Sequence, residues 1–188
     1  MSAVAQSAAA RFKQTTNEFL RFICDIIAEL HDEGLTTTGP AALALPISVI
    51  QAFDAGTLVG FFVDCHADWV KVSTQDAAFI LDTVPQAYKK IPFDVNLLTV
   101  PLKKYQEFQK NGYNGSYDNE DWPITDEDIS NMWKYFGSMI RTACNHIHAQ
   151  RQPQYSSSGQ ITYTNPSYRS DIDLEKMVQV FNVTLDRV

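Results

Sequence analysis

Residues 125–150 place the strongest constraint on the fold of this chain. Apolar side chains recur there at helical spacing over about seven turns, with polar side chains between them. The apolar positions are Ile129, Met132, Trp133, Phe136, Ile140, Ala143 and Ile147, and the opposite face carries Asn131, Lys134, Ser138, Arg141, Asn145 and His148. The Thr125 hydroxyl can cap the first turn, and the acidic residues 126–128 complement the positive end of the helix dipole. The pattern predicts one long helix that forms the spine of a core.

Helical spacing recurs along most of the rest of the chain. The first helix is expected over residues 8–33, stopped by Gly34, and others over 46–54, 56–70, a short stretch ending before Pro85, 101–112 and 171–183. Ser73 and Asp76 resemble a capping arrangement ahead of the short helix. Residues 95–100 could form a strand, but because the sequence offers no second run to pair with them, an extended segment is expected.

The segment from Arg151 to Ser170 is rich in Gln, Ser, Tyr, Pro and Gly, and it is too poor in aliphatic residues to make a core of its own. The predicted fold is therefore all-α, or mainly α. A single helical-bundle-like domain is expected over residues 1–150, and residues 151–188 are expected to form a long Tyr/Ser-rich extended arm plus a C-terminal helix.

The charge balance and the hydropathy of the chain exclude several partners. Asp and Glu number 22 against 15 Lys and Arg, so the net charge of -7 should repel phosphate backbones, and nucleic acid is not expected as a partner. The first ten residues lack the basic and apolar regions of a secretory signal, and no apolar run reaches the ~20 residues of a membrane span. Three cysteines, Cys24, Cys65 and Cys144, cannot complete an internal disulfide framework, which favours reduced thiols.

Two groups of side chains could bind a transition metal. They are Asp64, Cys65, His66 and Asp68 in one segment, and Cys144, His146 and His148 in another. Cys144 and His148 can share a helix face, but His146 projects about 160° away from Cys144 at ~100° per residue. No Cys-x-x-Cys or His-Glu-x-x-His accompanies them. We therefore expect no bound metal, with Cys65 and Cys144 as buried thiols and the histidines as surface or cap residues.

Signatures of catalysis are missing from the sequence. There is no Gly-x-Ser-x-Gly, no P-loop and no Gly-x-Gly-x-x-Gly, and the neighbouring carboxylates at 120–121 and 126–128 fall in a loop and at a helix start. The expectation is a protein that is not an enzyme, with no catalytic residues and no cofactor.

Five tyrosines lie in polar segments, where too few apolar residues surround them to bury their rings in a core. They are Tyr113, Tyr117, Tyr155, Tyr163 and Tyr168. Tyrosine is enriched at protein interfaces, because its ring buries area at low entropic cost while its hydroxyl tolerates water. These residues are the candidate interaction residues of the chain, and the alternative is that they fold back onto their own domain.

Short motifs give the chain a resemblance to a known family. They are Phe12 with Phe19-Leu20 and Ile26-Ile27, Asp76 with Phe79-Ile80, and Trp133-Lys134-Tyr135 at the opening of the long helix. Over residues 12–150 the chain resembles uncharacterised helical proteins of nucleocytoplasmic large DNA viruses of the phycodnavirus and mimivirus-like kind. It departs from them in residues 36–55 and 151–188. The resemblance implies a viral origin and no particular chemistry.

These observations favour a noncatalytic viral structural or virion-associated protein, such as a minor capsid component. It would contact other virion proteins or further copies of itself, in the virion or the host cytoplasm. The alternative is a soluble regulatory or host-interaction helical module. A metal-dependent enzyme that uses Asp64, His66, Asp68, Cys144 and His148 is the third hypothesis.

Overall fold

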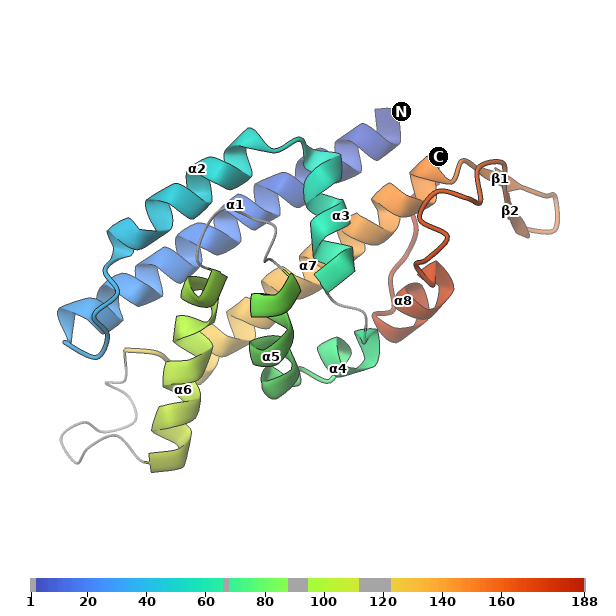
Figure 1. The fold of residues 1–188 in the computed structure, drawn as a ribbon. Helices are drawn as coiled ribbons and strands as arrows, with labels where there is room; N and C mark the ends of the chain where they lie inside the picture. Colours follow the sequence, from blue (N-terminus) through green and yellow to red (C-terminus); the bar gives the residue numbers. More distant parts are fainter. Residues whose placement is uncertain (1–2, 66–67, 88–94, 112–122, 188) are drawn as a thin grey trace.

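The computed structural model describes residues 3–65, 68–87, 95–111 and 123–187, and it confirms the predicted mainly α fold (Figure 1). The α-helices are α1 (Ala3–Asp32), α2 (Ala44–Ala52), α3 (Ala55–Cys65), α4 (Trp69–Ser73), α5 (Ala77–Ala87), α6 (Val100–Asn111), α7 (Asp126–Gln150) and α8 (Leu174–Val180). Two 3₁₀ turns, η1 (Pro40–Leu43) and η3 (Val95–Thr99), precede α2 and α6, and strands β1 (Pro153–Tyr155) and β2 (Ile161–Tyr163) follow α7.

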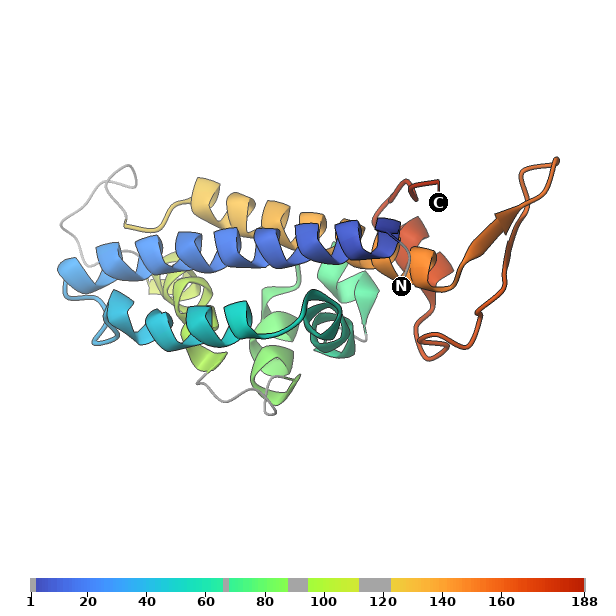
Figure 2. The ribbon, with the colours of Figure 1, turned by 90° about the horizontal axis from the view of Figure 1, so that it is seen from above.

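Helices α1 and α7 lie antiparallel along the length of the molecule, with the shorter helices α2, α3, α5 and α6 packed on one side of the pair (Figures 1 and 2). The apolar stripes of the two long helices meet in one core that includes Phe12, Leu20, Phe136 and Ile140. The prediction that residues 125–150 form the spine of the core is therefore confirmed.

Phe62 of α3 lies at the centre of an aromatic cluster. Its ring centroid is 5.2 Å from that of Phe12 on α1, 6.2 Å from that of Phe136 on α7 and 6.3 Å from that of Trp69 on α4. Edge-to-face and tilted contacts at these distances add to the hydrophobic burial of the rings. One side chain thus joins both long helices to the shorter ones.

The start of α7 is built as the sequence indicates. The Thr125 hydroxyl accepts a hydrogen bond from the Asp128 amide, and the Asp128 carboxylate accepts the Thr125 amide at 2.8 Å, which completes a capping box. Three acidic residues occupy the first turn. The predicted cap and dipole complement are confirmed.

The predicted helix over 56–70 is wrong in its last part. Helix α3 ends at Cys65, and the Asp68 carboxylate caps a separate helix α4 by accepting the Lys71 amide. Ser73 does not cap the next helix either, because its hydroxyl donates to the Val70 carbonyl, whereas Asp76 accepts the Phe79 amide and so caps α5 itself. Asp is a strong N-cap residue, which explains both corrections.

Other boundaries also differ from the prediction, and the first helix begins at Ala3, five residues before its expected start. Helix α5 continues through Pro85 to Ala87, and Val95–Thr99, expected to be extended, forms the 3₁₀ turn η3. Helix α8 is shorter than expected, since Asp173 accepts the Lys176 amide and so marks its first turn. A local capping side chain therefore decides where α8 begins.

The arm, expected to be extended, contains an antiparallel β-hairpin that projects beyond the C-terminal end of α7 (Figure 2). Strands β1 and β2 pair with Tyr155 opposite Ile161 and Pro153 opposite Tyr163. A turn with Gly159 at φ +80° joins the strands, and the Gly159 amide donates to the Ser156 carbonyl. Glycine adopts this left-handed conformation without steric cost.

In the described part of the chain, no single helix is both long and apolar enough to cross a membrane. The segments Pro40–Ala52 and Ala55–Asp64 pass the same test of length and composition together, although they are bent by 115° relative to each other.

Candidate functional site

The C-terminal end of α7 is enclosed on all sides. Every residue from Ala143 to Ala149 is at most 5% exposed, including Asn145, His146 and His148. Sequence periodicity placed Asn145 and His148 on a polar outer face and treated the histidines as surface or cap residues. That prediction is wrong, because the arm and the chain after α8 return to cover this end of the helix.

His148 anchors both strands of the hairpin. Its Nδ1 atom lies 3.0 Å from the Tyr163 hydroxyl, and its Nε2 atom lies 3.0 Å from the Tyr155 hydroxyl. The His148 side chain has no exposed surface. A neutral imidazole has one N–H and one bare nitrogen, so one tyrosine hydroxyl accepts from the ring and the other donates to it.

His146 joins the start of α1 to the segment after the hairpin. Its Nδ1 atom lies 2.9 Å from the Ala5 carbonyl oxygen, and its Nε2 atom lies 3.3 Å from the Tyr168 hydroxyl. A carbonyl oxygen can only accept, so Nδ1 carries the proton and the Tyr168 hydroxyl donates to Nε2. The two histidines therefore tie the start of α1, the hairpin and the segment after the hairpin to the end of α7.

Burial favours the neutral form of both histidines. It lowers the pKa of His146 and of His148; at His146 the hydrogen bond to the Ala5 carbonyl and then the Asp54 charge oppose this shift, and at His148 the Asp186 charge opposes it. Burial also raises the pKa of Tyr163 and of Tyr168, which keeps both hydroxyls protonated. The arrangement suits a structural hydrogen-bond network at neutral pH.

Arg151 fixes the segment that leads into α8. Its guanidinium donates to the carbonyl oxygens of Tyr168 at 3.0 Å, Arg169 at 2.6 Å and Ile172 at 2.8 Å. The planar guanidinium group presents several N–H donors in fixed directions and can bind several carbonyl oxygens at once. The smaller ammonium group of lysine cannot reach as many of them. This residue holds the base of the arm in one conformation.

The outer part of the hairpin is exposed and carries no charge. Residues 152–168 contain no Asp, Glu, Lys, Arg or His, although the whole chain has a net charge of -7. Tyr155 and Ile161, which face each other across the strands, are each 39% exposed. Ser, Gln and Tyr are the commonest residues of the segment, and Ser and Tyr are also enriched in antibody binding loops.

Three of the five candidate tyrosines are brought together here. The hydroxyls of Tyr155, Tyr163 and Tyr168 all bind histidines of α7, so these side chains have an intramolecular role that leaves part of the Tyr155 ring exposed. Tyr113 and Tyr117 lie outside the described residues. Contact with a partner stays a prediction for all five.

The candidate metal ligands are not brought together within the described ranges, where no group of three His, Cys, Asp or Glu side chains could hold an ion. The Cys144 thiol is buried in the core, which raises its pKa to about 12. Asp64 forms an ion pair with Arg169, and Asp68 caps α4. His66 lies outside the described residues, as does the side chain of Cys65.

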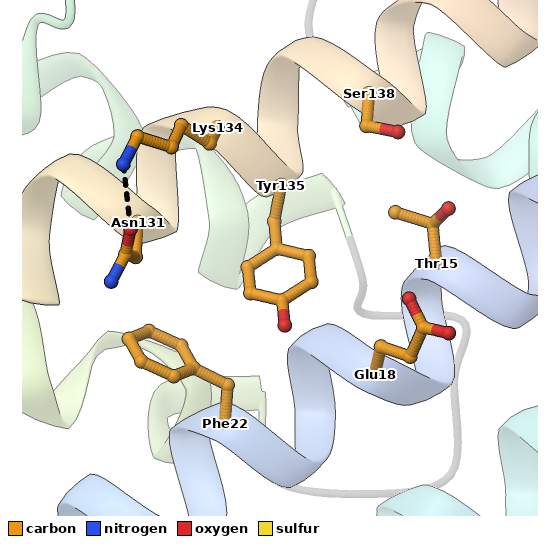
Figure 3. Close-up of a pocket in the computed structure, with 7 residues that line it drawn as sticks. All are labelled: Thr15, Glu18, Phe22, Asn131, Lys134, Tyr135 and Ser138. Carbon is orange, nitrogen blue, oxygen red and sulfur yellow. Dashed lines mark hydrogen bonds between the residues drawn. The ribbon is translucent and has the colours of Figure 1, made fainter.

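A groove of about 430 Å³ runs between α1 and α7 (Figure 3). It is lined by Thr15, Glu18, Phe22, Asn131, Lys134, Tyr135 and Ser138. Tyr135 points from α7 toward α1, and the Lys134 ammonium donates to the Asn131 side chain at 2.9 Å. Glu18 and Lys134 are both exposed to solvent, and we assign no ligand to the groove.

Comparison with known proteins gives no relative: no family model, no curated protein and no solved structure matches the chain. The resemblance to proteins of large DNA viruses therefore stays a prediction from the short motifs that carry it. The hairpin and the histidines that anchor it are the candidate site that the structure adds.

Proposed function

We propose that this chain is a noncatalytic protein that acts through protein–protein contacts, and that the exposed hairpin of residues 153–163 makes them. The observation that carries the proposal is the combination of a fixed base and an uncharged, exposed outer part. A surface that is already ordered costs less conformational entropy to bind than a mobile one.

The anchoring of the hairpin supports this role. An isolated two-stranded hairpin is marginally stable in water. Here Arg151 and His148 hold the base, while residues 156–162 are exposed and contribute little to the core. A segment that is held in place yet exposed is typical of binding loops on a rigid scaffold.

We further propose that these contacts are made in a virion of a large DNA virus, as a structural or minor capsid component. This second part of the proposal is supported by the resemblance carried by residues 12–150 alone. Mass spectrometry of purified particles tests it: the protein should be abundant there, and abundance in infected cytoplasm with absence from particles would favour a regulatory or host-interaction module.

Site-specific photo-crosslinking tests the contact function. A photoreactive amino acid at Gln154 on the hairpin should capture defined protein species in the cells that make the chain. The same group at Gln14, an exposed glutamine of α1, is the matched control. Equal capture at the two positions, or none at either, would overturn the proposal.

A further inference from the structure

The hydrogen bonds within the hairpin show which backbone groups point toward the partner strand and which point outward. The Ser156 amide donates to the Gln160 carbonyl, and the Thr164 amide donates to the Gln152 carbonyl. Hydrogen-bonded pairs alternate with non-hydrogen-bonded ones along an antiparallel ladder, so Gln154 and Thr162 form the next bonded pair.

The alternate residues direct their backbone groups away from the partner strand. On β2 these are Ile161 and Tyr163, each with an amide and a carbonyl at the outer edge. On β1 they are Tyr155 and Pro153, and proline has no N–H to donate. Edge strands are commonly protected by proline or by a charged side chain. The edge of β1 has such protection, whereas the edge of β2 has neither.

The charge distribution favours the hairpin as the place where two copies could meet. Two molecules of net charge -7 repel each other. Every charged residue lies outside 152–168, and the hairpin projects from the body of the molecule (Figure 2). Contact through the hairpin therefore brings no charged side chain of residues 152–168 into the interface between the two copies.

We infer that the hairpin binds a second copy of this chain by antiparallel pairing of β2 with β2, which gives a four-stranded sheet across a twofold axis. The inference rests on the proposed contact function and names its partner. Ile161 of each copy lies opposite Tyr163 of the other copy. The amide of each residue in this pair donates to the carbonyl of its partner, and the twofold axis repeats the pair. The axis then passes beside Thr162, which faces its own counterpart.

The side chains that this register brings together are complementary. On one face an aromatic ring, Tyr163, lies beside a β-branched side chain, Ile161 of the other copy, and on the other face the two Thr162 hydroxyls meet. Aromatic with β-branched and threonine with threonine are both favourable cross-strand pairs. A second copy would give the outward backbone groups of Ile161 and Tyr163 the hydrogen-bond partners that no described residue provides.

A charge placed on the twofold axis tests this arrangement. Thr162→Lys puts two ammonium groups directly opposite each other, and dimerisation of the full-length protein should become roughly tenfold weaker. Gln154→Lys is the matched control, because Gln154 is exposed, pairs with Thr162 and shares its face of the hairpin. Its two copies would lie about 14 Å apart, three strand spacings across the sheet, so the dimer should form almost as in the unmodified chain.

Sedimentation velocity over a wide concentration series measures the association. The unmodified chain should shift from monomer to dimer. An equimolar mixture of Thr162→Lys and Thr162→Glu proteins should recover the dimer that each loses alone, because the charges opposite each other then attract. Circular dichroism of each variant confirms that the helices are retained.

A chain that stays monomeric at every concentration, or a Lys/Glu mixture that does not recover the dimer, would overturn the inference. If Thr162→Lys and Gln154→Lys weaken the dimer equally, the pairing of β2 with β2 is wrong. Capture of another protein at Gln154 by a chain that does not dimerise would overturn this inference alone and leave the contact function in place. Loss of both results would overturn both.

Discussion

The Nε2 atom of His148 lies 3.0 Å from the hydroxyl oxygen of Tyr155, and this contact ties an exposed strand to a fully buried histidine. The other ring nitrogen is engaged by Tyr163 in the same way. Because the two tyrosines come from different strands, one imidazole fixes both strands of the hairpin. The anchoring makes direct predictions about stability and pH.

Replacement of either tyrosine by phenylalanine should destabilise the hairpin. Tyr155→Phe and Tyr163→Phe each leave a buried ring nitrogen of His148 without its partner, at a cost of about 1–3 kcal/mol. Hydrogen exchange of the amides in residues 153–163 should become faster in both variants. Tyr135→Phe is the control, because no hydrogen bond of the Tyr135 hydroxyl is found within the described residues; an equal loss of protection there would contradict the anchor.

The histidines should make stability depend on pH. Both histidines have a pKa below the ordinary value of 6.5 in the folded chain, chiefly because of burial. At a pH between the folded and the unfolded pKa, the unfolded chain therefore binds more protons than the folded one. The free energy of unfolding should therefore be highest above 6.5 and fall as the pH drops below it. Thermal melts of the unmodified chain across this range measure the effect.

Variants assign the pH dependence to these rings. His148→Gln retains a donor and an acceptor for the tyrosine hydroxyls but cannot titrate, so the melting temperature of this variant should depend less on pH below 6.5. His31→Gln, at an exposed histidine near the end of α1, is the control and should reduce the slope less than His148→Gln does. A slope that falls equally in both variants would show that the buried histidines are not its source.

Arg151→Lys should loosen the base of the arm. An ammonium group cannot reach the Tyr168, Arg169 and Ile172 carbonyls with one rigid fork, and the loss is expected to be about 2–3 kcal/mol. Urea unfolding measures the change, and proteolysis between α7 and α8 should be faster. Arg141→Lys, at an exposed position of α7, should have almost no effect, and similar losses at both sites would argue against the fork.

How far the sequence predicts the structure depends on whether the stabilising contacts are local. The positions of the apolar residues and of Thr125 and Asp128 are enough to place α7, because a helix stripe and its cap involve neighbours in the chain. The same spacing puts His148 on a polar face, yet His148 is buried by Tyr155 and Tyr163, which return from beyond the helix end. Helical periodicity alone contains no information about that return.

The hairpin illustrates a second limit. Ile161, Thr162, Tyr163 and Thr164 alternate as a strand would, and Gly159 provides the turn, so the sequence does contain the pattern. A low aliphatic content made the segment resemble a loop, because a core is the usual reason for order. Order here comes from hydrogen bonds to buried histidines that the sequence gives no reason to place beside it.

The capping box of α7 should contribute measurably to the stability of the whole fold. Thr125→Ala removes the hydroxyl that accepts the Asp128 amide and should lower the free energy of unfolding by about 1 kcal/mol, whereas Thr125→Ser should retain most of it. Thr142→Ala, within the same helix, is the matched control. Its hydroxyl donates to the Ser138 and Met139 carbonyls, which the helix already uses, so this change should be nearly neutral because alanine is the better helix former.

Chemical denaturation of the three variants measures the difference, and equal losses for Thr125→Ala and Thr142→Ala would show that the box does not stabilise the helix. Combining Thr125→Ala with Asp128→Ala should cost less than the two single losses added together, because both side chains belong to one reciprocal set of hydrogen bonds.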